Sequence, residues 1–418
     1  MIQKIIASKI IKSNRFYYGW IIIAISSLGY FFSGPGQTYF TSVFIDSYIN
    51  DFGWSRSTVS SLYSISTLLS GFLLFLVGRF SDRFGQKRII IIVAALLGAT
   101  CLWNSFVNSL WMLFIGFFIS RLTGQGSMTL LPSTIVPQWF IKRRAFAYSL
   151  VSIGGVIGSA ILPPINTWLI KIWGWNSVWI LWAGLLWFFF IPLTYIFLYN
   201  KPKELGLLPD NEMKNDIDDF KELRIKDKSW TLKEAMVTTS FWGMLFCQTI
   251  LPFITTGIVF HFVSILNSKG LSSSTASIVL SLLAVVSFPT TFIAGYFLDK
   301  IKLHYAVMLI YFLQLSALVV LFNITSIYSA AAFAILQGIA MGLQSVCTGV
   351  LWPNYFGIKH LGSIRGIVMT ATVIASALGP LPFGISFDTI GTYTEAILII
   401  MILPIIGIVV AFLSPKPM

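Results

Sequence analysis

Long apolar segments run through this sequence from end to end and limit the folds that it can adopt. Each is bounded by charged residues or by Gly, Pro and Asn, and each is long enough for a helix to cross a bilayer, which takes about 20 residues. Twelve such segments predict an all-α polytopic membrane protein with twelve transmembrane helices. The expected helices are 16–48, 56–78, 88–106, 110–138, 145–170, 177–199, 238–267, 273–298, 304–323, 327–356, 362–387 and 393–413.

The composition excludes a soluble globular protein. Of the 418 residues, 56% are hydrophobic and 10% are charged, against roughly 45–50% and about 25% in an ordinary soluble domain. Cys101, Cys247 and Cys347 all lie inside apolar segments, where thiols behave as small hydrophobic groups. No disulfide framework, metal site or cofactor is therefore expected.

The net charge of +13 is concentrated on one side of the predicted membrane. From the N-terminal tail through every second loop, 24 Lys and Arg residues fall on that side, and 3 fall on the other. Basic loops stay in the cytoplasm, so both termini are expected to be cytoplasmic, in the cell (inner) membrane. The N-terminal segment is expected to be a tail rather than a removed signal peptide. The lipid bilayer is the expected partner, and nucleic-acid binding is not needed to explain the charge.

The two halves of the chain repeat each other at an offset of 217 residues. Gly78 aligns with Gly295 and Asp82 with Asp299, whereas the fourth and tenth helices align at 216. Each half has an even number of helices, so both enter from the same side, as in parallel-repeat transporters with a site between the halves. The predicted domains are a cytoplasmic N-terminal tail (1–15), a six-helix bundle (16–199), a polar cytoplasmic linker (200–235), a second, pseudo-symmetric six-helix bundle (236–413) and a cytoplasmic C-terminal tail (414–418).

The loop after the second predicted helix carries the most informative motif, Gly78-Arg-Phe-Ser-Asp82-Arg83-Phe-Gly85-Gln-Lys87-Arg88. A glycine allows close helix packing, and an acid can cap the N-terminus of a neighbouring helix. The motif resembles the signature G-x-x-x-D-R/K-x-G-x-R/K-R/K of the major facilitator superfamily. The resemblance implies the major facilitator fold and secondary active transport by alternating access. It also implies a conformational gate at Gly78, Asp82, Arg83, Gly85, Arg88 and, in the second copy, Asp299.

Three shorter motifs resemble the branch of monocarboxylate porters and oxalate/formate antiporters. They are Tyr18-Gly19-Trp20 and the segments 52–56 and 140–144. The resemblance implies a monocarboxylate or related organic anion as substrate, with proton symport as an option. The apolar parts of predicted helices 1, 8 and 11 carry no charge, so transport of a neutral, zwitterionic or amphipathic solute by uniport or efflux stays open.

Two ionisable side chains, Arg121 and His261, are expected within the hydrocarbon, where charge is costly and usually functional. Arg121 begins Arg121-Leu-Thr-Gly-Gln-Gly126, which resembles the superfamily's arginine-and-glycine motif in helix 4. It is a candidate for substrate charge or for proton coupling. His261 titrates near neutral pH and is a candidate for proton coupling and substrate binding. Either could instead be a packing residue that is satisfied by its neighbours.

Polar residues at helical spacing form stripes on helices 1, 4, 7 and 10 that are expected to face one central cavity. Helix 4 is expected to present Arg121 to Pro132 along one uniform face, and Gly34-Pro35-Gly36 is expected to distort helix 1. Neutral polar residues also join helices to one another, and that interpretation stays open for each of them. The substrate-binding candidates besides Arg121 and His261 are Tyr30, Ser33, Gln37, Gln125, Thr129, Thr255, Gln344, Ser345 and Trp352.

An enzyme is not expected, because the predicted helices offer one histidine and neither paired carboxylates nor metal-ligand spacing. A membrane sensor is a remote alternative that would need an output domain. No nucleotide-binding loop occurs, so a gradient is expected to supply the energy. The expected partners are a small-molecule substrate and, as an option, protons, and the protein is expected to be a monomer.

Overall fold

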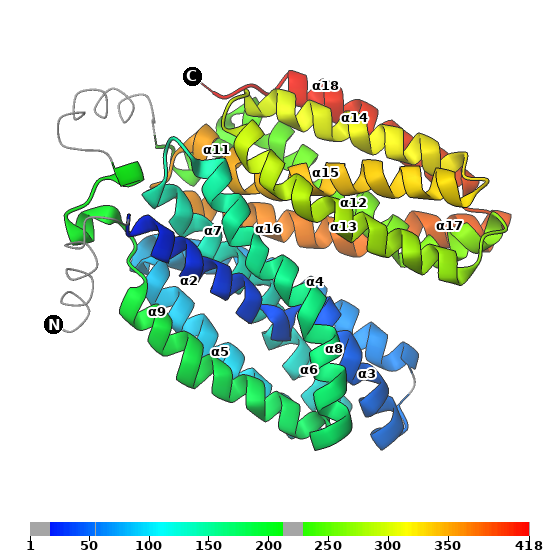
Figure 1. Cartoon of the computed structure of the whole chain (residues 1–418), viewed down its shortest axis with the longest axis horizontal. Helices are drawn as coiled ribbons and strands as arrows, with labels where there is room; N and C mark the ends of the chain where they lie inside the picture. Colours follow the sequence, from blue (N-terminus) through cyan, green and yellow to red (C-terminus); the bar gives the residue numbers. More distant parts are fainter. Residues whose placement is uncertain (1–16, 55, 212–228, 418) are drawn as a thin grey trace. The chain divides into compact units, whose positions relative to one another are not determined.

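The computed structural model describes residues 17–54, 56–211 and 229–417, and within these ranges the chain forms helices and loops but no strand (Figure 1). The chain divides into two compact units. The first takes residues 1–229 and 357–370, and the second takes residues 230–356 and 371–418. The predicted N-terminal tail (1–15) and residues 212–228 of the predicted linker lie outside the described residues.

The first unit is a bundle in which α2 packs on α7 and α8, α4 on α6, and α5 on α6 and α8. Gly174 has a φ of +77° inside α8, so this long element is two helices joined at a left-handed glycine. The elements in chain order are α2 (Gly19–Phe32), η1 (Gly34–Gly36), α3 (Thr38–Phe52), α4 (Arg56–Phe84), α5 (Gln86–Ser105), α6 (Leu110–Ser120), η2 (Arg121–Ser127), α7 (Met128–Trp139), α8 (Arg144–Gly184), η3 (Leu185–Phe190), α9 (Ile191–Phe197), η4 (Pro202–Leu205) and η5 (Pro209–Asn211).

In the second unit α15 contacts both α13 and α14, and α18 contacts α12 and α14 (Figure 1). Helix α16 belongs to the first unit up to Thr370 and to the second from Ala371. The elements are α11 (Leu232–Val237), α12 (Thr239–Ser268), α13 (Ser273–Leu298), α14 (Leu303–Phe322), α15 (Ile327–Phe356), α16 (Leu361–Leu378), α17 (Leu381–Ile390) and α18 (Thr394–Phe412).

Nine helical segments of the described residues are long and apolar enough to span a membrane. One of them, Arg144–Phe197, covers the predicted helices 145–170 and 177–199 together. The predicted helices 16–48 and 110–138 are absent from the nine because the structure breaks each into pieces shorter than 18 residues. The total of twelve spans remains a prediction, and its difference from nine has this physical origin.

The helix boundaries repeat between the two halves. Helices α4, α5, α6 and α8 begin at residues 56, 86, 110 and 144, and α13, α14, α15 and α16 begin 217 residues later. Left-handed glycines repeat at the same offset, Gly53 with Gly270 and Gly174 with Gly391. The repetition therefore extends from the sequence to the backbone conformation.

Predicted helix 4 departs from this symmetry and from a uniform α-helix. Between α6 and α7 lies the π-helical segment η2, in which the Ser127 hydroxyl donates to the carbonyl oxygen of Leu122, five residues earlier. The starts of α6 and α15 are 217 residues apart, but Gly126 and Gly342 are 216 apart. The first half therefore has one residue more, and the wider π-turn accommodates it. The predicted uniform stripe from Arg121 to Pro132 is wrong, because the α-helical period does not hold across η2.

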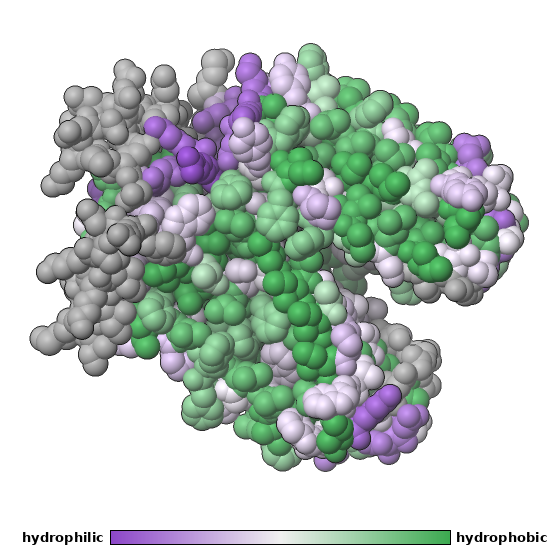
Figure 2. Space-filling model, in the orientation of Figure 1, coloured by the Kyte–Doolittle hydropathy of each residue, from purple (hydrophilic) through white to green (hydrophobic). Residues whose placement is uncertain are grey.

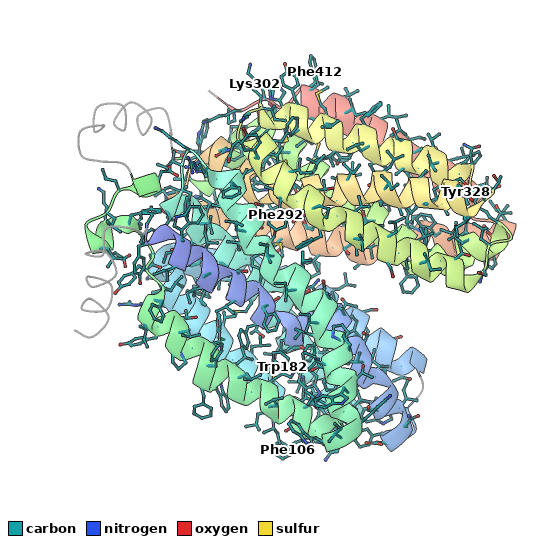
Figure 3. All side chains as sticks on the ribbon, in the orientation of Figure 1. Phe106, Trp182, Phe292, Lys302, Tyr328 and Phe412 are labelled. Atoms are coloured by element: carbon teal, nitrogen blue, oxygen red, sulfur yellow. The ribbon has the colours of Figure 1, made fainter. Side chains whose placement is uncertain are left out.

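Apolar side chains cover the helix sides in each unit, and polar residues gather near the helix ends (Figure 2). Phe106 and Phe412 are 64% and 59% exposed, whereas Trp182 is buried among the helices of the first unit (Figure 3). Large exposed apolar side chains on helices are suited to contact with lipid. The three cysteines are buried and free.

Candidate functional site

Two irregular backbone segments, η1 and η2, meet in the first unit. Helix α2 ends in the 3-10 turn η1, and Gln37 is extended before α3, so the predicted distortion at Gly34-Pro35-Gly36 is confirmed. A Cβ built on Gly36 would lie 2.6 Å from the Cα of Gly124, and a Cβ on Gly124 would lie 2.6 Å from the Cα of Gly36. Only glycine permits this approach, which brings the carbonyl groups of η1 close to η2.

Arg121, the first residue of η2, is 5% exposed and lies in a socket built from α3, α4 and η1. Its Nε donates to Thr67 Oγ1 at 3.0 Å, and its Nη1 donates to the Gly36 carbonyl at 3.1 Å and to Thr38 Oγ1 at 3.2 Å. The guanidinium carbon lies 4.9 Å from the centroid of the Tyr63 ring. The Tyr63 hydroxyl in turn donates to Thr38 Oγ1 at 2.9 Å. We call these five residues the arginine socket.

The arginine socket carries an unbalanced positive charge. Among the described residues, no carboxylate pairs with Arg121 and its Nη2 makes no hydrogen bond. An arginine at the centre of a membrane helix costs about 2.5–3.5 kcal/mol on insertion scales. The neutral hydrogen bonds and the tyrosine ring offset part of this cost. An anion beside Nη2 would supply the missing countercharge.

A polar chain links the socket to the end of α2. The side-chain amide of Gln37 donates to Ser33 Oγ at 3.0 Å, and the Ser33 hydroxyl donates to the Tyr30 carbonyl at 2.6 Å. Gln125 and Thr129 are half-buried, and the Thr129 hydroxyl donates to the Gln125 carbonyl at 2.5 Å. The predicted residues of helices 1 and 4 are therefore brought together around the break between α2 and α3.

The second unit has no cation at the position that corresponds to Arg121. At the 216-residue offset this position is Gln337, whose side-chain amide exchanges two hydrogen bonds with that of Gln314, at 2.9 and 3.0 Å. Thr255 lies with Gln337 along a narrow, mainly apolar recess between α12, α13 and α15. This part of the second unit is polar but uncharged.

The other candidates of α15 differ in accessibility. Gln344 is half-buried and Ser345 is exposed. Trp352 has no exposed surface and packs on Phe241 and Phe356. In this conformation the indole of Trp352 is part of the core.

His261 lies on α12 beside the break between α16 and α17. Its Nε2 lies 3.2 Å from the carbonyl oxygen of Pro380, and its ring stacks on Phe383 with centroids 5.9 Å apart and on Tyr393 with centroids 5.5 Å apart. Gly257, one turn earlier, packs against the Gly379 carbonyl. His261 thus contacts the hinge of this helix from within the second unit.

Asp82 caps the N-terminus of α16. Its carboxylate accepts hydrogen bonds from the backbone N–H of Gly362 at 2.8 Å, the backbone N–H of Ser363 at 2.7 Å and the Ser363 hydroxyl at 2.6 Å. A Cβ on Gly78 would lie 2.0 Å from the Gly362 carbonyl oxygen, so α4 and α16 touch through backbone atoms. The prediction that the acid of the signature motif caps a neighbouring helix is confirmed, and we call this contact the α4–α16 cap.

The remaining gate candidates lie around the cap or apart from it. Gly85 has a φ of +86° and begins the turn into α5. Arg83 and Arg88 are exposed, and the Arg83 guanidinium lies 5.2 Å from the Phe84 ring centroid. Asp299, the counterpart of Asp82, is exposed at the C-terminus of α13.

Arg144 and Arg365 are each 4% exposed, so the expectation that only Arg121 and His261 are ionisable and interior is wrong. Both lie in the first turns of helices, next to loops that looked solvated in the sequence. Arg144 Nε donates to the Phe140 carbonyl at 3.1 Å, and Arg365 Nη1 donates to the Ser133 carbonyl at 3.2 Å. A sequence signal for Arg365 exists only through the repeat, which aligns it with Tyr148.

The repeated helical bundles, their apolar surfaces and the arginine held at a broken helix define an integral membrane protein of the secondary-transporter class. The profile of the Major Facilitator Superfamily matches residues 20–330 and 245–418, so the chain belongs to that superfamily and is a transporter rather than an enzyme.

Individual relatives are distant. The chain is 24% identical over 406 residues to monocarboxylate transporter 12 of Xenopus laevis, covering 91% of this chain and 85% of that protein. It is 22% identical over 405 residues to the gallate transporter of Pseudomonas putida, covering 88% of each. The solved proton:xylose symporter XylE superposes with a TM-score of 0.71 at 15% identity, over 96% of each chain, and shares the fold.

Proposed function

We propose that the protein transports a small organic anion, most simply a monocarboxylate, by alternating access, with Arg121 binding the carboxylate. The observation that carries this proposal is the arginine socket, a buried guanidinium whose described partners are all neutral. A carboxylate at Nη2 would form a charge-assisted hydrogen bond in a region of low dielectric constant, where such bonds are strongest. The names of the monocarboxylate and gallate transporters among the relatives agree with an anionic substrate.

The uncharged second unit favours a substrate with one negative group. Gln337 occupies the position related to Arg121 and is already paired with Gln314. A dianion would leave its second charge without a cation at that related position, which is costly in a desolvated site. We therefore expect monocarboxylates to be preferred over dicarboxylates.

Counterflow into proteoliposomes tests the proposal. Purified protein is loaded in turn with L-lactate, 4-hydroxybenzoate, gallate, malonate or xylose, and uptake of the same labelled compound is followed. At least one monocarboxylate should exchange, and Arg121→Gln should raise its KM about 30-fold or more, because losing one partner of a buried charge pair costs about 2–5 kcal/mol. Arg121→Lys should recover only part, since a lysine cannot reproduce the planar donor geometry.

Arg144→Gln is the matched control, since Arg144 is equally buried and bonds to the backbone of its own helix start. It should leave the KM of every exchanging carboxylate unchanged. Exchange of xylose alone, or of carboxylates with an unaltered KM in Arg121→Gln, would overturn the anion proposal. Exchange of xylose alone would favour the neutral-solute alternative, to which the uncharged Gln344 and Ser345 would be suited.

A further inference from the structure

A second buried arginine lies in the first unit, on the part of α16 that belongs to it. Arg365 is 4% exposed, its Nη1 donates to the Ser133 carbonyl of α7, and its guanidinium carbon lies 5.8 Å from the centroid of the Tyr148 ring. Loop arginines at a membrane surface normally keep their charge in water. The chain instead places this charge against α7 and α8, where it needs a function to justify its cost.

The cation acts on a pair of tyrosines. The hydroxyls of Tyr148 and Tyr30 are 2.7 Å apart, and their rings are perpendicular with centroids separated by 6.5 Å. A cation over a phenol ring draws electron density from it and makes its hydroxyl a better donor. Tyr148 therefore donates to Tyr30, and the Tyr30 hydroxyl hydrogen is directed to another acceptor. Tyr30 is half-buried, and Tyr148 is 5% exposed.

This group lies on the same two helices as the arginine socket. Tyr30 precedes Gly36 in the broken helix that contacts Arg121, and Ser133 follows Arg121 by twelve residues in the helix made of η2 and α7. Twelve residues correspond to a rise of about 18 Å. One small carboxylate cannot touch both arginines at that separation. It can meet them one after the other, with Ser33 and Gln37 next to Tyr30 in the polar chain.

We propose that Arg365, Tyr148 and Tyr30 form a second carboxylate-binding position, which the substrate occupies on the side that the charge pattern predicts to be cytoplasmic. That side follows from α7, which runs from the socket toward the basic loop at 142–144. Tyr30 would donate to the carboxylate, and Arg365 would supply its countercharge. This inference rests on the proposed function, because it takes the same anion as the arginine socket.

The test measures KM from each side of the membrane. The probe is whichever radiolabelled carboxylate exchanges fastest among L-lactate, 4-hydroxybenzoate and gallate, assayed in right-side-out and inside-out vesicles. Arg365→Gln should raise the cytoplasmic-side KM about tenfold or more, the loss expected for one charge-assisted contact, and leave the opposite KM within about twofold. Arg365→Lys should recover part of the loss, and Tyr30→Phe should raise the same KM about threefold to tenfold. Arg121→Gln should raise KM from both sides.

A structural role would give a different result. If Arg365 only stabilised the fold, Arg365→Gln would lower Vmax equally from both sides, as Arg144→Gln would, without a change in KM. An unchanged KM in Arg365→Lys and Tyr30→Phe, both of which keep the side-chain volume, would overturn the inference even if Arg365→Gln did not fold. If Arg121→Gln shifted KM while these variants did not, this inference alone would fail. If Arg121→Gln had no effect, the proposed function would fail first.

Discussion

Replacing Asp82 with Asn should release the N-terminus of α16. The carboxylate accepts three hydrogen bonds from Gly362 and Ser363, whereas an amide has one acceptor oxygen and turns an N–H toward the same donors. A hydrogen bond to a charged group contributes about 1.5–3 kcal/mol and a neutral one about 0.5–1.5, so each bond weakens by about 1 kcal/mol. After a reduction for the partial exposure of Asp82, we expect a loss of about 2–3 kcal/mol.

Amide hydrogen exchange measures this loss directly. The N–H groups of Gly362 and Ser363 use Asp82 as their acceptor, so their protection depends on the α4–α16 cap. A loss of about 2–3 kcal/mol corresponds to roughly 30- to 150-fold faster exchange. Mass spectrometry of peptides covering residues 358–366 in detergent-solubilised protein would record the change.

The internal repeat provides a matched control. Asp299→Asn makes the same chemical change at the exposed counterpart of Asp82. It should leave exchange at Gly362 and Ser363 unaltered. Equal exchange rates in the wild type and Asp82→Asn, or an equal acceleration by Asp299→Asn, would refute the assignment of the carboxylate as the cap.

Gly36→Ala should destabilise the protein by about 1–3 kcal/mol or more, since overpacking forces the backbone apart and its Cβ would lie 2.1 Å from a carbonyl oxygen of α6. Gly184→Ala, with open space around it, should be neutral or stabilising, and equal thermal midpoints would contradict the packing of η1 on η2. Gln337→Leu should cost about 1–3 kcal/mol by leaving the Gln314 amide unpaired, and the double change Gln314→Leu with Gln337→Leu should recover most of the loss in a thermal double-mutant cycle; strict additivity would contradict the pair. His261→Gln should keep counterflow but abolish substrate accumulation driven by a pH gradient, because glutamine takes up no proton; unaltered accumulation would exclude His261 as the coupling residue.

The sequence predicted the features that depend on periodicity and local chemistry. The helices 273–298 and 327–356 agree with α13 and α15 residue for residue. Glycine and proline predicted the break at 34–36, and the signature acid was expected to cap a helix. These predictions succeed because apolar length, missing N–H groups and carboxylate chemistry act locally.

The sequence could not supply the features that depend on tertiary contacts. Nothing in the motif of Asp82 indicates that its partner lies 280 residues away at Gly362. Arg365 looked like a loop residue because its burial is produced by α7 and α8, not by its sequence neighbours. The neutral environment of Arg121 also required the structure, since Thr67 and Thr38 come from separate segments.

The single additional residue in η2 has a historical consequence. Helix α15 retains an uninterrupted α-helical form at the related position, so the two copies differ there by one codon, inserted in one or deleted from the other after the duplication. The copy with the longer reading has the arginine, and the shorter copy has a glutamine pair. The asymmetry of charge between the halves therefore coincides with a length change of one residue, and ancestral variants without that codon would be the natural starting point for reconstructing how the anion site arose.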